Sequence, residues 1–138
     1  MAKRKRKSKK DWIIFSYKNY EKELIKIQKG LGAKKHDYGK PRLELIIYEF
    51  EELMARVLSG GAQKYGDYNW TQGMNLTRYL GALKRHAGKW EMGESYDYES
   101  GLHHMGHVAV NAMFIFASEL YNLGKDNRWK RPKKTKKG

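Results

Sequence analysis

The feature that most constrains this 138-residue chain is a long apolar run near its C-terminal end, Leu102–Leu123. From Met105 to Ala117 the run is apolar on nearly every side, whereas a helix at a protein surface keeps a polar face. Ser100 stands just ahead of the run, where we expect a helix N-cap. The run therefore predicts a central helix, or one that is also buried against another subunit.

Three other segments show the spacing of amphipathic helices: Asp11–Gly30 through its second half, and Leu43–Ser59 and Leu76–Met92 throughout. The glycine-rich segment Gly60–Asn75 is expected to end the second of these helices and to form a loop. No segment alternates clearly enough for a strand. The sequence thus predicts an all-α bundle of about four helices in a single domain, residues 11–127.

The net charge of +14 lies entirely in the two ends of the chain. Residues 1–10 and 128–138 each carry seven Lys or Arg and no acidic residue, which leaves fifteen basic and fifteen acidic groups in residues 11–127. Such tails are typical of disordered segments that contact phosphates in a salt-sensitive way, although solubility explains them equally well. They predict weak contact with nucleic acid or no partner at all.

The absence of cysteine excludes disulfides and thiolate metal sites, so a metal would need carboxylate or imidazole ligands. The basic start of the chain is not followed by the apolar segment of a secretory signal, and no apolar run is long enough to span a membrane. We therefore expect a soluble, cytoplasmic protein with no membrane partner.

The stretch Glu94–Asn111 concentrates metal-ligating side chains at the entrance to the last predicted helix. Its first half supplies carboxylates and its second half histidines. His104, His107 and Asn111 are spaced i, i+3, i+7 and share one helical stripe, while His103 and His107 form a second pair at i, i+4. Any single histidine could simply satisfy a hydrogen bond in a packed bundle. The cluster as a whole predicts a site that binds a ligand or a metal.

Carboxylates also occur in the predicted helix Leu43–Ser59, where Glu49 and Glu52 lie along the edge of the apolar face. This position directs the pair towards a neighbouring helix. Glu52 and Arg56 equally fit an ordinary i, i+4 ion pair on a solvated face. The spacing leaves both interpretations open.

Several residues could recognise a nucleotide. Lys64 could neutralise phosphate and Trp70 could stack on a base, or Trp70 could pin its loop to the core. Arg85 belongs to a cationic stripe on the predicted helix Leu76–Met92. No GxxxxGK[ST] motif is present, which excludes a P-loop.

Together these segments resemble the MazG-like all-α nucleoside triphosphate pyrophosphohydrolases. Glu49-x-x-Glu52 and Glu94-x-x-Asp97 are similar to the two acidic motifs of that family. A closer similarity, over about residues 41–120, is to the phage dATP/dGTP diphosphohydrolases, the MazZ-like group. The matching runs are Pro41–Ile46, Ala55–Leu58, Gly61–Trp70, Arg85-His86 and Asp97–His104.

One departure concerns the second acidic motif, because Glu94 and Asp97 precede the last helix and lie farther from Glu52 than is usual in MazG-like proteins. This leaves open whether Asp97, or His104 and His107, completes a metal site.

The resemblance implies hydrolysis of a purine deoxynucleoside triphosphate, dATP or dGTP, between its α- and β-phosphates, as in phage nucleotide-pool remodelling. It also implies a dimer or tetramer and a Mg²⁺ or Mn²⁺ cofactor. The implied catalytic residues are Glu49, Glu52 and Asp97, with Glu94, His104 and His107 as further metal ligands, Lys64 and Arg85 as phosphate-binding residues, and Asn69 and Trp70 as base-binding residues. The alternative from another class is a non-catalytic helical protein that binds nucleic acid through its basic tails.

Overall fold

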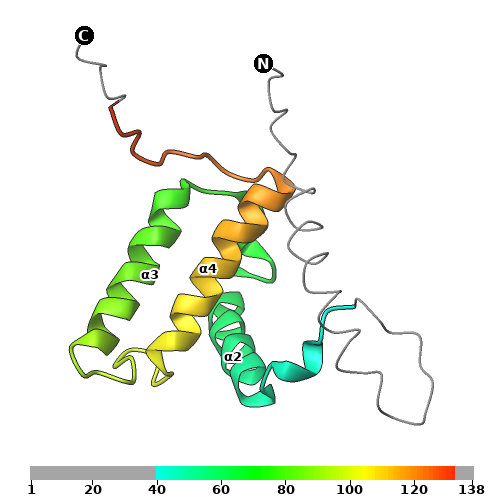
Figure 1. Cartoon of the computed structure of the whole chain (residues 1–138), viewed down its shortest axis with the longest axis vertical. Helices are drawn as coiled ribbons and strands as arrows, with labels where there is room; N and C mark the ends of the chain where they lie inside the picture. The colour runs from blue at the N-terminus through cyan, green and yellow to red at the C-terminus, as the bar shows by residue number, and fades with distance from the viewer. Residues whose placement is uncertain (1–39, 133–138) are drawn as a thin grey trace, which may run out of the picture. The chain divides into compact units, whose positions relative to one another are not determined.

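The computed structural model describes residues 40–132, and all of its regular structure is helical (Figure 1). The predicted helix Asp11–Gly30, the first tail and the end of the second tail lie outside the described residues. Two units divide at Ile46, and the first contributes the short 3-10 helix η1, Leu43–Leu45. The second contains, in chain order, α2 (Tyr48–Tyr65), the 3-10 helix η2 (Asn69–Gln72), α3 (Leu76–Glu91) and α4 (His104–Tyr121). The all-α prediction is confirmed, with three α-helices in residues 40–132 instead of about four.

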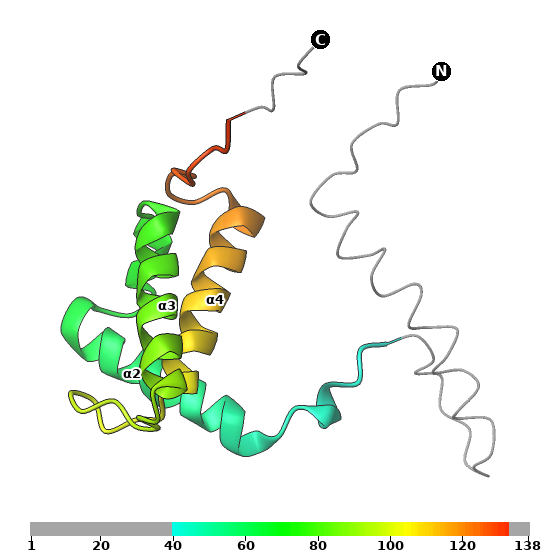
Figure 2. The ribbon, with the colours of Figure 1, turned by 60° about the vertical axis from the view of Figure 1, so that its left-hand side comes forward.

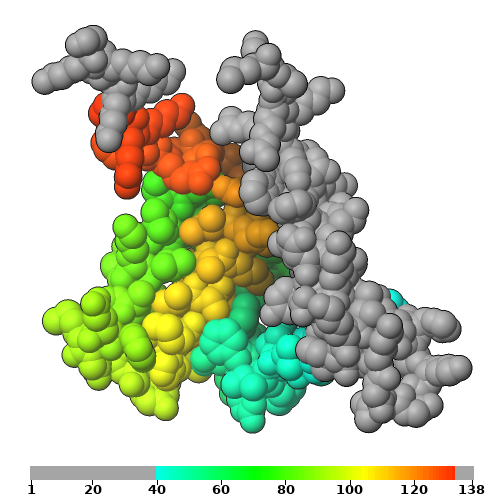
Figure 3. All heavy atoms as spheres, in the orientation of Figure 1, coloured from blue at the N-terminus to red at the C-terminus, as the bar shows by residue number. Residues whose placement is uncertain are grey.

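Helix α4 is the centre of the second unit, as its apolar sequence predicts. It runs antiparallel to α3 and beside it in both ribbon views, and it also contacts α2 (Figures 1 and 2). In the space-filling view its first turns lie between α2 and the end of α3 (Figure 3). The most completely buried apolar side chains are Leu76 and Tyr79 of α3 and Val110 and Ala117 of α4. The core of this unit is therefore chiefly the contact between α3 and α4.

Self-association stays a prediction. Phe116, on the central helix, is 52% exposed, so α2 and α3 leave part of α4 uncovered. None of the helices in residues 40–132 is both long enough and apolar enough to cross a lipid bilayer.

Helix α2 differs at both ends from the predicted helix Leu43–Ser59. Ile46 and Ile47 are extended, so the α-helix begins only at Tyr48. The glycine pair at 60 and 61 does not end it, because neither residue adopts the positive φ of a terminating glycine. The helix ends where Gly66 does adopt it, with φ at 88°. Part of the predicted loop Gly60–Asn75 is therefore helical.

The start of α4 also differs from prediction, since Ser100 is not its N-cap. His103 caps the helix instead, because its Nδ1 accepts a hydrogen bond from the backbone N–H of Met105 at 3.1 Å. Ser100 is instead hydrogen-bonded to Asp97. Both the backbone N–H and the hydroxyl of Ser100 donate to the carboxylate of Asp97.

The segment after α4 returns to the beginning of α3. The backbone N–H of Leu76 donates to the carbonyl of Lys125 at 3.0 Å, and the N–H of Lys125 donates to the carbonyl of Met74 at 3.1 Å. Arg128, which opens the predicted second tail, pairs with Asp126 and Glu119. The antiparallel pair of helices is thus joined at the end remote from the histidines.

Candidate functional site

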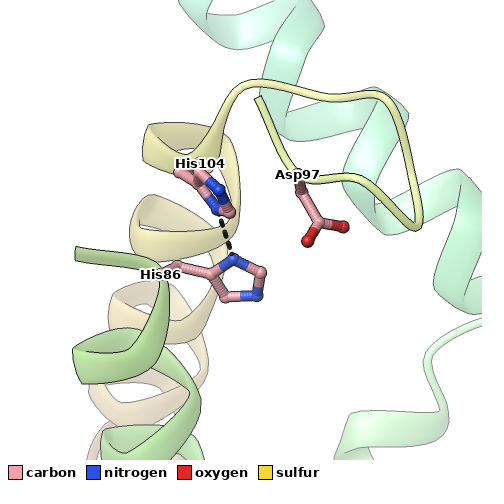
Figure 4. A group of neighbouring side chains, drawn as sticks. All are labelled: His86, Asp97 and His104. Atoms are coloured by element: carbon pink, nitrogen blue, oxygen red, sulfur yellow. Dashed lines mark hydrogen bonds between the residues drawn. The ribbon is translucent and has the colours of Figure 1, made fainter. Parts of the chain in front are cut away.

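Side chains from three elements meet at the other end of the helix pair: His86 from α3, Asp97 from the connecting loop and His104 from the first turn of α4 (Figure 4). One ligand atom from each side chain lies within 4.8 Å of those of the other two. The Nδ1 atoms of His86 and His104 are 2.8 Å apart. We call these three residues the His–Asp cluster. It is the one such group of three or more potential ligands in residues 40–132.

His104 is fully buried, with 0% of its surface exposed. At 2.8 Å, its Nδ1 and that of His86 share one hydrogen bond, so one of them carries a proton and the other presents a lone pair. The Nε2 of His104 faces the carboxylate of Glu94 at 3.4 Å. Both ring nitrogens of this buried imidazole therefore have polar neighbours.

Asp97 is 8% exposed and is held by the turn around it. Ser100 donates to its Oδ2 from the backbone N–H at 3.0 Å and from the hydroxyl at 2.8 Å. Burial is the largest single effect and favours the neutral acid, but the two hydrogen bonds from Ser100, together with the nearby rings of His107 and His86, outweigh it and lower the pKa of Asp97 below its ordinary value. Its carboxylate is therefore ionised at neutral pH.

A third histidine adjoins the His–Asp cluster. The ring of His107 stacks on that of His86 with 4.2 Å between centroids, and its Nε2 is 2.9 Å from the hydroxyl of Ser100. Burial lowers the pKa of both rings; His107 lowers that of His86 further, and Asp97 partly counters the shift in His107. Both imidazoles are therefore neutral at pH 7, the form that can ligate a metal.

These pKa shifts predict that the metal-free protein is less stable in weak acid. The unfolded chain binds protons at His86 and His107 below about pH 6.5, whereas the folded chain resists them, so stability is full above that pH and is lost as the pH falls towards the folded pKa values. Asp97 adds a loss only in more acidic solution, below about pH 4. Thermal unfolding in EDTA at pH 7.5 and pH 5.5 should show the lower midpoint at pH 5.5. A variant with both His86→Gln and His107→Gln should flatten this dependence, and an unchanged slope would contradict the assignment.

The predicted carboxylate pair of α2 is not part of the His–Asp cluster. Glu52 forms the ion pair with Arg56 that the sequence allows, at 2.7 Å, and Glu49 is exposed. Of the other predicted metal ligands, Asp97 and His104 belong to the cluster, whereas Glu94 and His107 touch its members. The roles assigned to Glu49 and Glu52 stay predictions.

The predicted phosphate-binding residues lie on different elements. Lys64, near the end of α2, forms an ion pair with Glu99 at 3.1 Å, and this hydrogen bond raises the pKa of the lysine. Arg85 instead lines an open cavity of about 370 Å³, together with Arg78 and Asn111. The cavity also includes Met74 and Thr77, so it extends along α3 towards the end remote from the histidines, and no residue of the His–Asp cluster lines it. Asn111 donates from Nδ2 to the backbone carbonyl of His107 at 2.8 Å.

The two predicted base-binding residues, Asn69 and Trp70, have different surroundings. The ring of Trp70 lies 5.8 Å from that of Phe114, which supports its structural role of holding η2 on α4. Asn69 is exposed. Neither residue belongs to the cavity or to the cluster.

His86 and Ser100 are the parts of the site that sequence reasoning missed. A signal for His86 was present, because it lies seven residues after Tyr79 and three after Leu83, on the stripe of α3 that faces inward. A polar residue that continues an apolar stripe is a candidate for a buried site. For Ser100, no comparable spacing in the sequence distinguishes a serine that holds a carboxylate from a serine that caps a helix.

Comparison with known proteins supports the similarity to phage dATP/dGTP diphosphohydrolases, whereas the broader MazG-like resemblance stays a prediction. A dATP/dGTP diphosphohydrolase of Salmonella phage PMBT28 is 50% identical over 82 residues, which are 59% of this chain and 28% of that protein. The chain therefore spans less than a third of this relative's length. No solved structure matches the chain. A family model described as dATP/dGTP diphosphohydrolase, N-terminal, matches residues 32–128. This match covers more than half of the chain, which therefore belongs to the dATP/dGTP diphosphohydrolase N-terminal family.

Proposed function

We propose that the protein is a metal-dependent pyrophosphohydrolase that converts dATP or dGTP to the monophosphate and pyrophosphate. Membership of the diphosphohydrolase family supports this activity. The structural observation that carries it is the His–Asp cluster, in which two imidazoles and a buried carboxylate from three elements come together as potential metal ligands. In a phage-infected cell such an enzyme would remodel the nucleotide pool in the host cytoplasm.

The cavity provides groups for the phosphates. Arg78 and Arg85 are permanently charged and can each hold phosphate oxygens with a fork of N–H donors. Gly81 leaves room for the guanidinium of Arg85, because the Nη1 of that arginine lies 3.3 Å from where a Cβ on Gly81 would stand. A charge on the leaving pyrophosphate would be stabilised there. Lys64 stays a second candidate for phosphate binding.

The donors of the His–Asp cluster fit a metal ion, since they combine an ionised carboxylate with imidazole nitrogens and two of the three side chains are buried. A bound ion would neutralise the phosphates and lower the pKa of the attacking water. With its lowered pKa, Asp97 is better suited to be a ligand than a general base. Neutral His107 is the better candidate to accept the proton, at its Nδ1, because its Nε2 donates to the Ser100 hydroxyl, whose own hydrogen goes to Asp97.

A panel of nucleotides tests the proposal. The protein is incubated with each of the four dNTPs and with ATP, in Mg²⁺ or Mn²⁺, and the nucleotide products are separated by ion exchange. We expect dAMP or dGMP, with pyrimidine substrates cut more slowly. Absence of turnover with every nucleotide and metal would refute the proposal, and accumulation of a diphosphate would indicate a different phosphohydrolase.

The nucleic-acid-binding alternative depends mostly on residues outside 40–132 and stays a prediction. It is distinguished by deleting residues 1–10 and 128–138, because nucleotide turnover should survive the truncation whereas retention on DNA should not.

A further inference from the structure

We propose that His86, Asp97 and His104 select a first-row transition-metal ion, such as Mn²⁺, Co²⁺ or Zn²⁺, over Mg²⁺. Magnesium prefers an octahedral shell of oxygen ligands, whereas imidazole nitrogen suits the transition metals. Two of the three side chains in the cluster offer nitrogen, and no carboxylate of α2 joins them. The proposal rests on the proposed function, because it names the metal that the same site would use. Metal binding is measured without nucleotide, so the metal assignment and the proposed function can be refuted independently.

The two imidazoles already converge. Their Nδ1 atoms are 2.8 Å apart, so two lone pairs are directed at one point that a proton occupies when no metal is bound. Two nitrogens at ordinary bonding distance from one tetrahedral ion would be separated by roughly 3.3 Å. A shift of roughly half an ångström would therefore convert the hydrogen bond into two metal bonds.

Outer contacts fix the orientation of each donor. Histidine ligands usually donate their second ring N–H to a carboxylate, and Glu94 lies at 3.4 Å from the Nε2 of His104 in the position for this role. Ser100 donates twice to the Oδ2 of Asp97. Within residues 40–132, the other oxygen, Oδ1, has a single polar contact, with the Nζ of Lys89 at 4.0 Å. This oxygen is therefore available to an ion.

Burial distinguishes the cluster from an accidental group of surface ligands. His104 is 0% exposed and Asp97 is 8% exposed, and the ring of His86 is covered on one face by His107. In the described part of the chain, the buried carboxylate of Asp97 is paired with a lysine or arginine only through the Nζ of Lys89 at 4.0 Å, so a positive charge in direct contact with it is missing there. A divalent cation would supply that charge.

Cobalt titration tests the site directly. The full chain is stripped with EDTA, exchanged into buffer and titrated with CoCl₂, and the visible absorption of the ion is recorded. We expect saturation at one ion per chain, release of that ion by Zn²⁺, and no competition from a hundredfold excess of Mg²⁺. His86→Gln should weaken cobalt binding by about tenfold to a hundredfold or more.

His103→Asn provides a matched control, because His103 is outside the cluster and asparagine can still cap α4. It should bind cobalt as the parent does. His104 is avoided as the main variant because it is fully buried, so that its replacement would disturb packing as well as metal binding. Circular dichroism verifies that His86→Gln remains helical.

Three outcomes would overturn the metal assignment: no saturable binding, equal loss in His86→Gln and His103→Asn, or displacement of cobalt by Mg²⁺ at similar concentration. If dGTP is still hydrolysed in Mg²⁺ by His86→Gln, the proposed function survives and the assignment of the metal fails. If cobalt binds as expected but no nucleotide is turned over, the assignment stands and the proposed function fails.

Discussion

Asp97→Asn is expected to reduce turnover of dATP or dGTP by at least about a hundredfold while the protein stays folded. The amide keeps the size of the side chain and can still accept a hydrogen bond from Ser100, but it removes the negative charge opposite the two imidazoles. Charge stabilisation by a metal amounts to several kcal/mol, and each 1.36 kcal/mol of lost transition-state stabilisation is about a factor of ten in rate. Initial rates at saturating nucleotide and metal give the comparison.

Asp67→Asn is the matched control for this variant. Asp67 is an exposed aspartate in the turn after α2 and is outside the His–Asp cluster, so the same chemical change should leave turnover near the parental value. If Asp97→Asn also retains near-parental activity at limiting metal, then the His–Asp cluster is not the catalytic centre.

Gly124→Ala is expected to destabilise the fold by roughly 3 kcal/mol or more, from positive-φ strain combined with overpacking. Gly124 has φ at 66°, and a Cβ there would collide with the backbone carbonyl oxygen and nitrogen of Met74, which cannot move aside as a side chain could. The collision would break the contact between the segment after α4 and the start of α3. Chemical denaturation followed by circular dichroism measures the loss.

Gly101→Ala separates the two contributions. Gly101 has nearly the same backbone conformation, with φ at 69°, but a Cβ there meets nothing within 4 Å. It should show the strain alone, about 1 kcal/mol. Equal effects of the two variants would mean that the close approach of Gly124 to Met74 does not stabilise the fold.

Local patterns predicted most of the helical structure. The predicted helix Leu76–Met92 and the observed α3 differ by one residue, because the inward stripe and the glycine at 93 are both local signals. The ends of α2 were predicted wrongly, since the glycine pair at 60 and 61 can either end a helix or continue one. Whether such glycines take a positive φ depends on the surrounding fold and cannot be read from the local sequence.

In the candidate site, too, residues that are close in sequence could be predicted, whereas residues brought together by helix packing could not. Asp97 and His104 were predicted from a single ligand-rich stretch, because they are close in sequence. His86 lies on the preceding helix and reaches the cluster only because α3 and α4 pack antiparallel. Ser100 was assigned to the helix end because a serine before a helix has the same sequence pattern whether it caps the helix or holds a carboxylate.

The most direct test of the central claim is to follow dGTP hydrolysis by phosphorus NMR in ¹⁸O-labelled water. The proposed attack between the α- and β-phosphates predicts two products, dGMP and pyrophosphate, with a single labelled oxygen on one of them and no inorganic phosphate at early times. The same spectra should show almost no product with Asp97→Asn and normal product with Asp67→Asn. Formation of triphosphate, or of dGDP and phosphate, would contradict the account, and so would equal product from the two variants.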